Sequence, residues 1–480
     1  MIAYNQIPLG DGDTRSSIAT QSDGSPEIIG KSASKKTWTG WLARNSEAVG
    51  ISIVLLMLFA ALFDRAVYFV PSEPNDLRFI SQVAKTSDPL KYLIGDWGEG
   101  PYVGGQYGMY RPIHPISLWL VYKFFGVDAK PNQLINLGLH FANVLVLLMI
   151  ILRIQKDRFA AMLYAALFMV SMYTVSPAIW VTNRALLQVG LALLLLIHHA
   201  LKSNEIRAPL KTSYVLFLSC FALLSKESGL IVPLFALVVS LYKSSTTLDR
   251  IRRATPYALI IGFYFLMRFF MFGSHSVNYH NGGYLFGIRH YNFYDDLPAN
   301  LRTLSLVDNV LKNLIAPFVP LFGVLGQLDF GRKALIVIIA TIALVVLSIK
   351  RPTILQMYCL VIIVLNAVLH FQIFRERSLY LAQIAFCLFV ASGTVVETGT
   401  RRWVTIGLAS TLLLVNILQV DHYIQGSYLW RDAEMNVRKL QTSLNTYPGR
   451  IDPEIAKRVL EYYKVQNIPH MPPPLEGEQP

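Results

Sequence analysis

The feature that most constrains this chain is a succession of long apolar segments joined by short charged turns. A helix needs about 20 apolar residues to cross a bilayer, because lipid cannot hydrogen-bond an open backbone. The chain has 480 residues, 53% hydrophobic and 15% charged, which is typical of a polytopic membrane protein. We therefore predict an all-α bundle of about 11 transmembrane helices. The predicted segments are 47–64, 132–152, 159–176, 183–201, 213–225, 229–242, 256–272, 334–349, 353–371, 379–397 and 403–420.

Basic side chains occur in every second turn of this succession. Cytoplasmic turns of membrane proteins are enriched in Lys and Arg, so we place these turns inside and the alternate turns outside. The order requires that segment 308–327, which contains Pro317 and Pro320, lies re-entrant or at the interface instead of crossing. No nucleic-acid partner is expected, because the net charge of +13 is spread over turns and forms no single basic face. The basic turns are 31–44, 153–158, 202–211, 243–253, 350–351 and 401–402.

This topology divides the chain into three regions. Residues 1–45 are expected to be a disordered cytoplasmic tail, residues 46–420 the transmembrane domain, and residues 421–480 a short tail on the outer side. The domain has two large outer loops, 65–131 and 273–333. The first loop ends in HPISLWLVYKFFG, whose aromatic and aliphatic residues predict a helix lying in the membrane interface.

Three charged residues lie in the last predicted outer turn of the bundle. The stretch FRERSLYL places Arg375, Glu376 and Arg377 on the outer side, where the charge rule disfavours cations. A bound anion accounts for them, because the guanidinium fork matches phosphate oxygens and Glu376 can orient one of the two arginines. In the alternative interpretation, both arginines extend to lipid headgroups.

Two other outer turns carry cations in the same way. The stretch SPAIWVTNRALLQ places Arg184 at the start of a helix, and LLSKESGL places Lys226 and Glu227 in a very short turn. A local pair between Lys226 and Glu227 would account for one of these turns. The coincidence of three cationic turns on one side favours a shared anionic ligand.

The first outer loop supplies carboxylates close to its start. The stretch SEPND contains Glu73 and Asp76 just beyond the first apolar segment. A carboxylate at this depth can act as a general base that takes a proton from an attacking hydroxyl. The alternative interpretation of Asp76 is a helix N-cap before LRFISQVA.

Taken together, five stretches resemble the GT-C glycosyltransferases, in particular the branch of TPR-bearing transmembrane O-mannosyltransferases and their bacterial relatives. The signatures of that branch run approximately as RPL, NLLLHxxN, AVAWIxxRxDLL, LLSKExA and ERYLYLPS. The resemblance extends in the same order over most of residues 65–400 and implies a GT-C-type bundle. The matching stretches are YRPIHPISLWLVYKFFG, NLGLHFANVLVLLMIILR, SPAIWVTNRALLQVGLALLLL, LLSKESGLIVPLFALVVSLY and FRERSLYLAQIAFCL.

The resemblance implies an inverting transferase that moves a sugar from a polyprenyl- or dolichyl-phosphate carrier to an acceptor hydroxyl on the non-cytoplasmic side. By that likeness Asp76 is the catalytic base, and the donor phosphate is bound by Arg184, Lys226, Arg375 and Arg377. A His in a helix bundle is also commonly a packing residue, so His140 ranks lower. The lower-ranked candidates are Glu73, Arg111, His114, His140, Asn143, Glu227, Glu376 and Tyr380.

Departures from the family pattern bear on cofactor and acceptor. Where many members have two adjacent acidic residues, this chain has Asn75 and Asp76, so we expect no cofactor and disfavour a divalent metal. Ser378, Ala382 and Gln383 replace family residues in the last motif, and no 34-residue TPR period follows. The acceptor is therefore left open between a protein Ser or Thr and a cell-surface glycan or lipid. The expected location is the bacterial inner membrane, with the site facing the periplasm or exterior.

Two alternative functions stay open at this point. One is a glycan polymerase or ligase that uses a pyrophosphate-linked donor, which also relies on outer arginines. The other is a multi-pass transporter or flippase without enzymatic activity. A transporter places ionisable residues at mid-depth and shows inverted repeats. In this chain the acidic residues concentrate at the outer ends of the segments, which favours the enzyme.

Overall fold

The computed structural model describes most of the predicted transmembrane region. The chain divides into two compact units, Met1–Glu47 and Ala48–Pro480. The described residues are 38–68, 74–95, 110–126, 129–155, 157–202, 211–244, 246–272, 284–285, 288–289, 299–318, 330–349, 353–370, 376–394 and 399–426, with the single positions 454 and 457.

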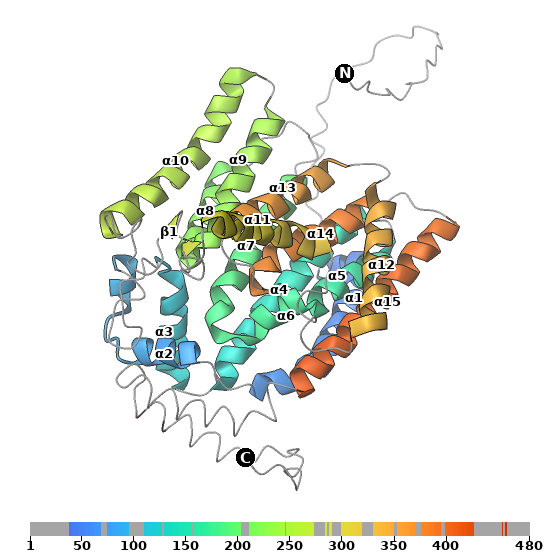
Figure 1. The fold of residues 1–480 in the computed structure, drawn as a ribbon, viewed down its shortest axis with the longest axis horizontal. Coiled ribbons are helices and arrows are strands. Elements are labelled where there is room, and N and C mark those ends of the chain that lie inside the picture. The colour runs from blue at the N-terminus through green and yellow to red at the C-terminus, as the bar shows by residue number, and fades with distance from the viewer. Residues whose placement is uncertain are drawn as a thin grey trace, which may run out of the picture. The chain divides into compact units, whose positions relative to one another are not determined.

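The first part of the chain consists of helices joined by short connections (Figure 1). Its elements are α1 (Trp38–Phe63), η1 (Arg65–Tyr68), α2 (Pro74–Ala84), η2 (Pro89–Leu93), α3 (Ile113–Phe125), α4 (Ala129–Ile154), α5 (Arg158–Val170), α6 (Met172–Ile179), η3 (Val181–Asn183), α7 (Arg184–Lys202), α8 (Thr212–Ser225), η4 (Glu227–Leu230), α9 (Ile231–Lys243) and α10 (Thr247–Phe272).

The second part adds five helices and one small strand pair. The strands β1 (Tyr284–Leu285) and β2 (Ile288–Arg289) are antiparallel, with Tyr284 opposite Arg289 and Leu285 opposite Ile288. The helical elements are α11 (Ala299–Ile315), η7 (Ala316–Phe318), α12 (Phe330–Ile349), α13 (Ile354–Leu369), η8 (Glu376–Leu379), α14 (Tyr380–Gly393) and α15 (Thr400–Gly426). Apart from the strand pair, the predicted all-α fold class is confirmed in the described residues.

Every predicted apolar segment falls on a helix, but only some helices have the dimensions of a span. Among the described residues, four stretches are long and apolar enough to cross a membrane: Ser46–Phe63, Lys130–Ile154, Val181–Leu201 and Thr400–Asp421. A fifth is the pair α5 and α6, which is bent by 53° at its break. Apart from α10, whose 26 residues do not meet these criteria, the remaining predicted segments lie on shorter apolar helices, so the count of 11 crossings stays a prediction.

The break between α5 and α6 leaves backbone carbonyls that the bundle satisfies internally. Ser171 takes an extended conformation between the two helices. The Thr174 hydroxyl donates to the Phe168 carbonyl at 2.5 Å, and the Met169 carbonyl lies 3.0 Å from His140 Nε2. Such side-chain partners help a bundle to tolerate a broken helix at membrane depth, because they pair two of the carbonyls at the break.

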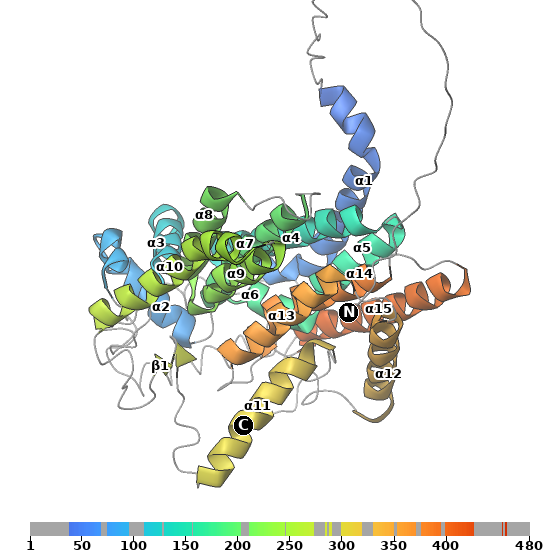
Figure 2. The ribbon, with the colours of Figure 1, turned by 90° about the horizontal axis from the view of Figure 1, so that it is seen from above.

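The core is built where α4, α5, α7 and α14 meet (Figures 1 and 2). α4 packs against α5 and α7, and α14 packs against α13 and α5. Nearly all of α14 is buried, including Tyr380 at its first position. Gly190 of α7 leaves room for the Tyr380 side chain, because a Cβ at position 190 would lie 2.6 Å from the Tyr380 ring.

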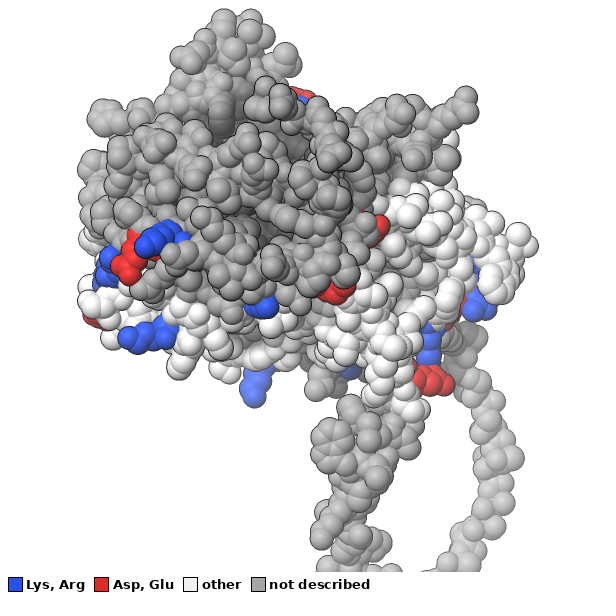
Figure 3. Space-filling model, turned by 90° about the horizontal axis from the view of Figure 1, so that it is seen from below, with Lys and Arg blue, Asp and Glu red and all other residues white. Residues whose placement is uncertain are grey.

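Large apolar side chains cover the outside of several helices. Phe270 of α10 is 75% exposed, and Phe217, Leu259 and Val346 are also exposed. On the face in Figure 3, the described atoms are mostly uncharged, and charged side chains occur as small separate groups. Apolar surface of this extent is unfavourable in water and matches contact with lipid.

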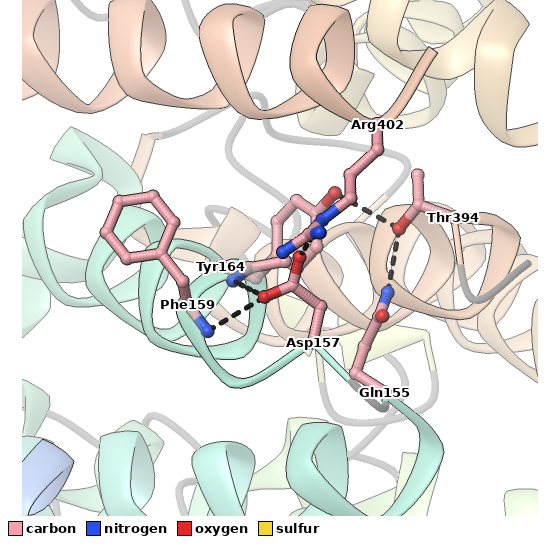
Figure 4. A network of polar contacts seen from close by, with 7 residues as sticks. Gln155, Asp157, Phe159, Tyr164, Thr394 and Arg402 are labelled. Carbon is pink, nitrogen blue, oxygen red and sulfur yellow. Dashed lines mark hydrogen bonds and ion pairs between the residues drawn. The ribbon is translucent and has the colours of Figure 1, made fainter. Parts of the chain in front are cut away.

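Two of the predicted cytoplasmic turns, at Asp157 and at Arg402, meet in a polar network (Figure 4). Asp157 accepts from the backbone N–H groups of Phe159 and Ala160, which caps α5, and from Arg402 Nε at 2.6 Å. Gln155 Nε2 donates to the Thr394 hydroxyl at 2.8 Å. Turns that the charge pattern places on one side are thus in direct contact.

Several expectations for the connecting regions are refined. The stretch HPISLWLVYKFFG forms α3, as expected for a helix there. α1 begins at Trp38, so the tail predicted to be disordered as far as residue 45 already contains a helix at its end. Segment 308–327 is α11 and η7 as far as Phe318 and lies beyond that outside the described residues. Whether it crosses stays a prediction.

The alternating topology predicts opposite labelling of two exposed positions. Leu90 lies in the first outer loop and is 62% exposed, and Leu248 lies in a predicted cytoplasmic turn and is 77% exposed. In a background with Cys220, Cys359 and Cys387 replaced, Leu90→Cys should react with a membrane-impermeant maleimide in intact cells. Leu248→Cys should react only after permeabilisation. Labelling of both from the same side would contradict the topology.

Candidate functional site

The predicted outer turns meet around the carboxylate of Glu227. Arg111, from the first outer loop, holds it with two groups: Nε lies 2.7 Å and Nη2 2.6 Å from Oε2. Nε also lies 2.9 Å from Oε1. The Glu227 side chain is 4% exposed and that of Arg111 21%. This short, charge-assisted pair joins two turns that lie far apart in sequence.

The turn LLSKESGL is shaped to present Glu227 at this position. α8 ends at Ser225, Lys226 is extended, and η4 begins at Glu227. Gly229 then packs directly on α8, because a Cβ there would lie 2.0 Å from the Ala222 carbonyl oxygen. The Gly229 N–H donates to the Lys226 carbonyl at 2.8 Å. Glycine is therefore required for the close return of the chain.

A second arginine approaches Glu227 from the end of α10. Arg268 Nη1 lies 3.9 Å from Glu227 Oε1, and both side chains are 4% exposed. The same Nη1 donates to the Tyr264 hydroxyl at 3.3 Å. Burial by itself raises the pKa of Glu227, but Arg111 and Arg268 together lower that pKa below its ordinary value. Glu227 is thus an ionised group and a weak base.

Lys226 and two histidines complete the cluster. Burial, together with the positive charges of Arg111, Arg184 and Lys226, lowers the pKa of His114 well below its ordinary value. The charges of Lys226 and Glu227 also act on His370, at the end of α13. We call Arg111, His114, Lys226, Glu227, Arg268 and His370 the cationic cluster.

Arg184 lies beside this cluster and is held by amides. Its Nε donates to Asn136 Oδ1 at 2.8 Å, and its Nη2 to Asn132 Oδ1 at 2.8 Å. Nη1 donates to the Ser117 carbonyl at 3.3 Å, and Nη2 also to the Asn132 carbonyl at 3.2 Å. With a side chain that is almost completely buried, Arg184 braces α4, α3 and α7, which favours a structural role over direct phosphate binding.

The helix that carries Asp76 docks next to the turn before Arg184. α2 packs against α3 and η3. Val83 of α2, Tyr92, Leu118 of α3 and Val181 of η3 form a small apolar cluster. Asp76 is the third residue of α2, so the interpretation of Asp76 as an N-cap is wrong. A carboxylate in the first turn is still favoured by the helix dipole.

His140, Asn143 and Tyr380 form a closed network inside the bundle. The Met169 carbonyl can only accept, so His140 carries its proton on Nε2, and Nδ1 accepts from the Tyr380 hydroxyl at 3.1 Å. Asn143 Nδ2 donates to that hydroxyl at 3.0 Å and to the Leu187 carbonyl at 3.0 Å. All three side chains are fully buried. This arrangement favours the packing interpretation of His140.

The remaining candidates lie partly or wholly outside the described residues. This applies to Glu73 and Arg375, and to the side chains of Asp76, Glu376 and Arg377. The backbone of η8, which carries Glu376 and Arg377, packs against α6 and α14. The turn with FRERSLYL therefore lies next to the turn that leads to Arg184.

Sequence reasoning missed Arg268, His370 and the two asparagines that hold Arg184. Signals for them were present. Arg268 interrupts the apolar run ALIIGFYFLMRFFMF, and a cation in such a run points to a function or a partner. Asn132, Asn136 and His140 are spaced by four residues, which places polar groups on one face of a helix.

Comparison with known proteins adds no identification: no family model, curated protein or solved structure matches this chain. In the described part of the chain, no group of three or more His, Cys, Asp and Glu side chains could hold a metal ion. The absence of a metal cofactor accordingly stays a prediction.

The network around Tyr380 generates a stability prediction. Tyr380→Phe removes the acceptor of Asn143 and the donor to His140 in a buried site, so the free energy of unfolding should fall by about 1–3 kcal/mol. Thermal unfolding in detergent measures this loss. Tyr242→Phe, at an exposed position on α9, should leave it unchanged. Normal stability with lost activity would instead indicate a chemical role for Tyr380.

Proposed function

We propose that this protein is a membrane glycosyltransferase that moves a sugar from a polyprenyl- or dolichyl-phosphate carrier to an acceptor hydroxyl on the non-cytoplasmic side. The acceptor is a protein Ser or Thr, or a cell-surface glycan or lipid. The proposal rests on the resemblance to GT-C enzymes and on the described geometry of the outer turns.

One observation gives the main support for this proposal. Arg111 from the first predicted outer loop and Arg268 from the end of α10 converge on Glu227 in the LLSKESGL turn. The apolar surface around such a site would admit the tail of a lipid carrier, and the cations would bind its phosphate. A cationic, largely buried site at a lipid boundary suits a lipid phosphate better than a soluble anion.

The proposed sugar transfer requires one general base and no general acid. The acceptor hydroxyl is a poor nucleophile at neutral pH and must lose a proton as it attacks the sugar carbon. The phosphate leaves as a stable anion and needs no proton. Asp76 is proposed as the base, because α2 carries it at the outer side next to the turn before Arg184. Glu227 is a poor candidate for this step, because two arginines keep it ionised.

The proposal predicts a selective loss of transfer in Asp76→Asn. The side chain keeps its size, while base catalysis worth about a hundredfold to ten-thousandfold is lost. Transfer from a synthetic polyprenyl-phosphate sugar should collapse while donor binding persists. Asp88→Asn is the matched control, because Asp88 is an exposed cap in the same loop. A near-normal rate in Asp76→Asn would place the base elsewhere.

A second prediction concerns the arginines of FRERSLYL. Arg375→Lys or Arg377→Lys keeps the charge and loses the bidentate fork, so donor use should fall by about tenfold or more. Kinetics over a range of donor concentrations measures the effect. Arg402→Lys, in the pair with Asp157 at the predicted cytoplasmic side, is the control. Wild-type kinetics in both variants would favour contacts to lipid headgroups.

A further inference from the structure

Asn366 is a fully buried amide whose side chain makes no hydrogen bond to the described residues. It lies in the last turn of α13 and is 0% exposed, and neither its Oδ1 nor its Nδ2 has a partner in the described part of the chain. An unpaired polar group in a protein interior is unfavourable, because it has lost its contacts with water and gained none in return. Such a side chain requires an explanation beyond packing.

The backbone around Asn366 is fixed, while the amide of its side chain is left available. The Asn366 carbonyl accepts from the His370 N–H at 3.1 Å and from His370 Nδ1 at 2.9 Å. Asn313 of α11 donates from Nδ2 to the His370 carbonyl at 3.0 Å, so α11 braces the same end of α13. An amide on a braced helix end is positioned before a ligand arrives, which lowers the entropy cost of binding.

A second buried amide lies across the contact between α13 and α14. Gln383, in the first turn of α14, is 3% exposed, and its Oε1 is unpaired among the described residues. Gln356 Nε2, in the first turn of α13, donates to the Phe389 carbonyl of α14 at 3.3 Å, so the two helices run antiparallel. This register brings Asn366 to the level of Tyr380, about one helical turn from Gln383.

These two amides flank the stretch that carries two of the proposed phosphate ligands. α13 ends at Leu369 and α14 begins at Tyr380, and Arg375 and Arg377 lie between them in the sequence. The sugar of the proposed donor is bonded directly to its phosphate. A phosphate at these arginines would therefore bring the sugar to the neighbouring ends of α13 and α14.

We infer that Asn366 and Gln383 bind hydroxyl groups of the donor sugar and so select which sugar the protein uses. The inference rests on the proposed function and deepens it, because it names the part of the site that recognises the sugar. The Asn366 amide offers an acceptor and two N–H donors, and Gln383 Oε1 offers a further acceptor. Since a hydroxyl both donates and accepts, two neighbouring sugar hydroxyls can pair with both ends of one amide. Both amides are neutral, which suits an uncharged sugar.

Buried amides discriminate strongly between sugars that differ at one hydroxyl. If the hydroxyl is absent or has the other configuration, the amide stays unpaired in the complex. A site built to hydrogen-bond a hydroxyl therefore rejects the analogue without it far more strongly than an apolar pocket could. Gln383 is also a position at which the last motif departs from the family pattern, so the sugar preference would be particular to this chain.

Thermal unfolding in nanodiscs tests the sugar subsite without any transfer reaction. The ligands are a synthetic polyprenyl phosphate and the same lipid phosphate carrying mannose, glucose or galactose. At least one sugar should raise the melting temperature of the wild-type protein further than the bare lipid phosphate does, because tighter binding to the folded state stabilises it more. Asn366→Leu keeps a similar shape without hydrogen-bonding groups, so it should lose this extra shift and keep the shift with the bare lipid phosphate. Gln383→Leu should reduce the extra shift.

Asn416→Leu is the matched control. Asn416 is a buried asparagine of α15 whose Nδ2 donates within its own helix, to the Leu412 carbonyl at 2.8 Å, and its replacement should leave the extra shift unchanged. An undiminished extra shift in Asn366→Leu, or none with any of the three sugars in the wild-type protein, would overturn the inference. Loss of both shifts together would also contradict it, since the effect would then not be specific to the sugar. Gln383→Leu decides the matter if Asn366→Leu fails to fold.

A transfer assay separates failure of this inference from failure of the proposed function. With the sugar that gives the extra shift, Asn366→Leu should lower kcat/KM for the donor by about tenfold to a hundredfold, as expected for two lost hydrogen bonds. If wild type and Asn366→Leu transfer sugar equally well, the function stands and the sugar subsite is wrong. If the wild-type protein shows a shift that depends on Asn366 but transfers no sugar, the subsite stands and the function is wrong.

Discussion

The ion pair between Glu227 and Arg111 is the contact on which the predicted outer side of this protein depends. Its atoms approach to 2.6 Å across a sequence separation of 116 residues. The carboxylate also faces Arg268, so one buried anion relates the first loop, the η4 turn and α10. Removing one partner of a buried pair is strongly destabilising, since it leaves the other charge uncompensated. The pair therefore fixes where three elements meet.

The packing of α4 against its neighbours relies on neutral polar side chains. Asn132 and Asn136 bind Arg184, and further along α4 His140 and Asn143 bind Tyr380. Each of these contacts has a defined donor and acceptor, which is how a low-dielectric interior tolerates polar side chains. This stripe ties α4 to α7 and α14, and it holds the broken helix α5–α6 through the Met169 carbonyl. α4 therefore supplies polar contacts both to Arg184 at the site and to Tyr380 in the bundle core.

This arrangement separates two kinds of arginine that the sequence alone treated alike. Arg184 uses its N–H groups for hydrogen bonds to asparagine side chains and to backbone carbonyls within the bundle. Arg268, in contrast, lies at ion-pair distance from the carboxylate of Glu227, which Arg111 already binds. The first pattern stabilises the helix packing, and the second concentrates positive charge at the predicted outer face.

The sequence by itself determined the helices, and it predicted which turns carry their cations on the outer side. Both are local properties: an apolar run of sufficient length must be helical in lipid, and a turn of two or three residues keeps its charges near the membrane surface. Only the tertiary structure decided that Glu227 pairs with Arg111 and Arg268 instead of its neighbour in the LLSKESGL turn, and that Asp76 lies within α2. Such pairings depend on which helices pack side by side, and the order of apolar segments along the chain does not specify those neighbours.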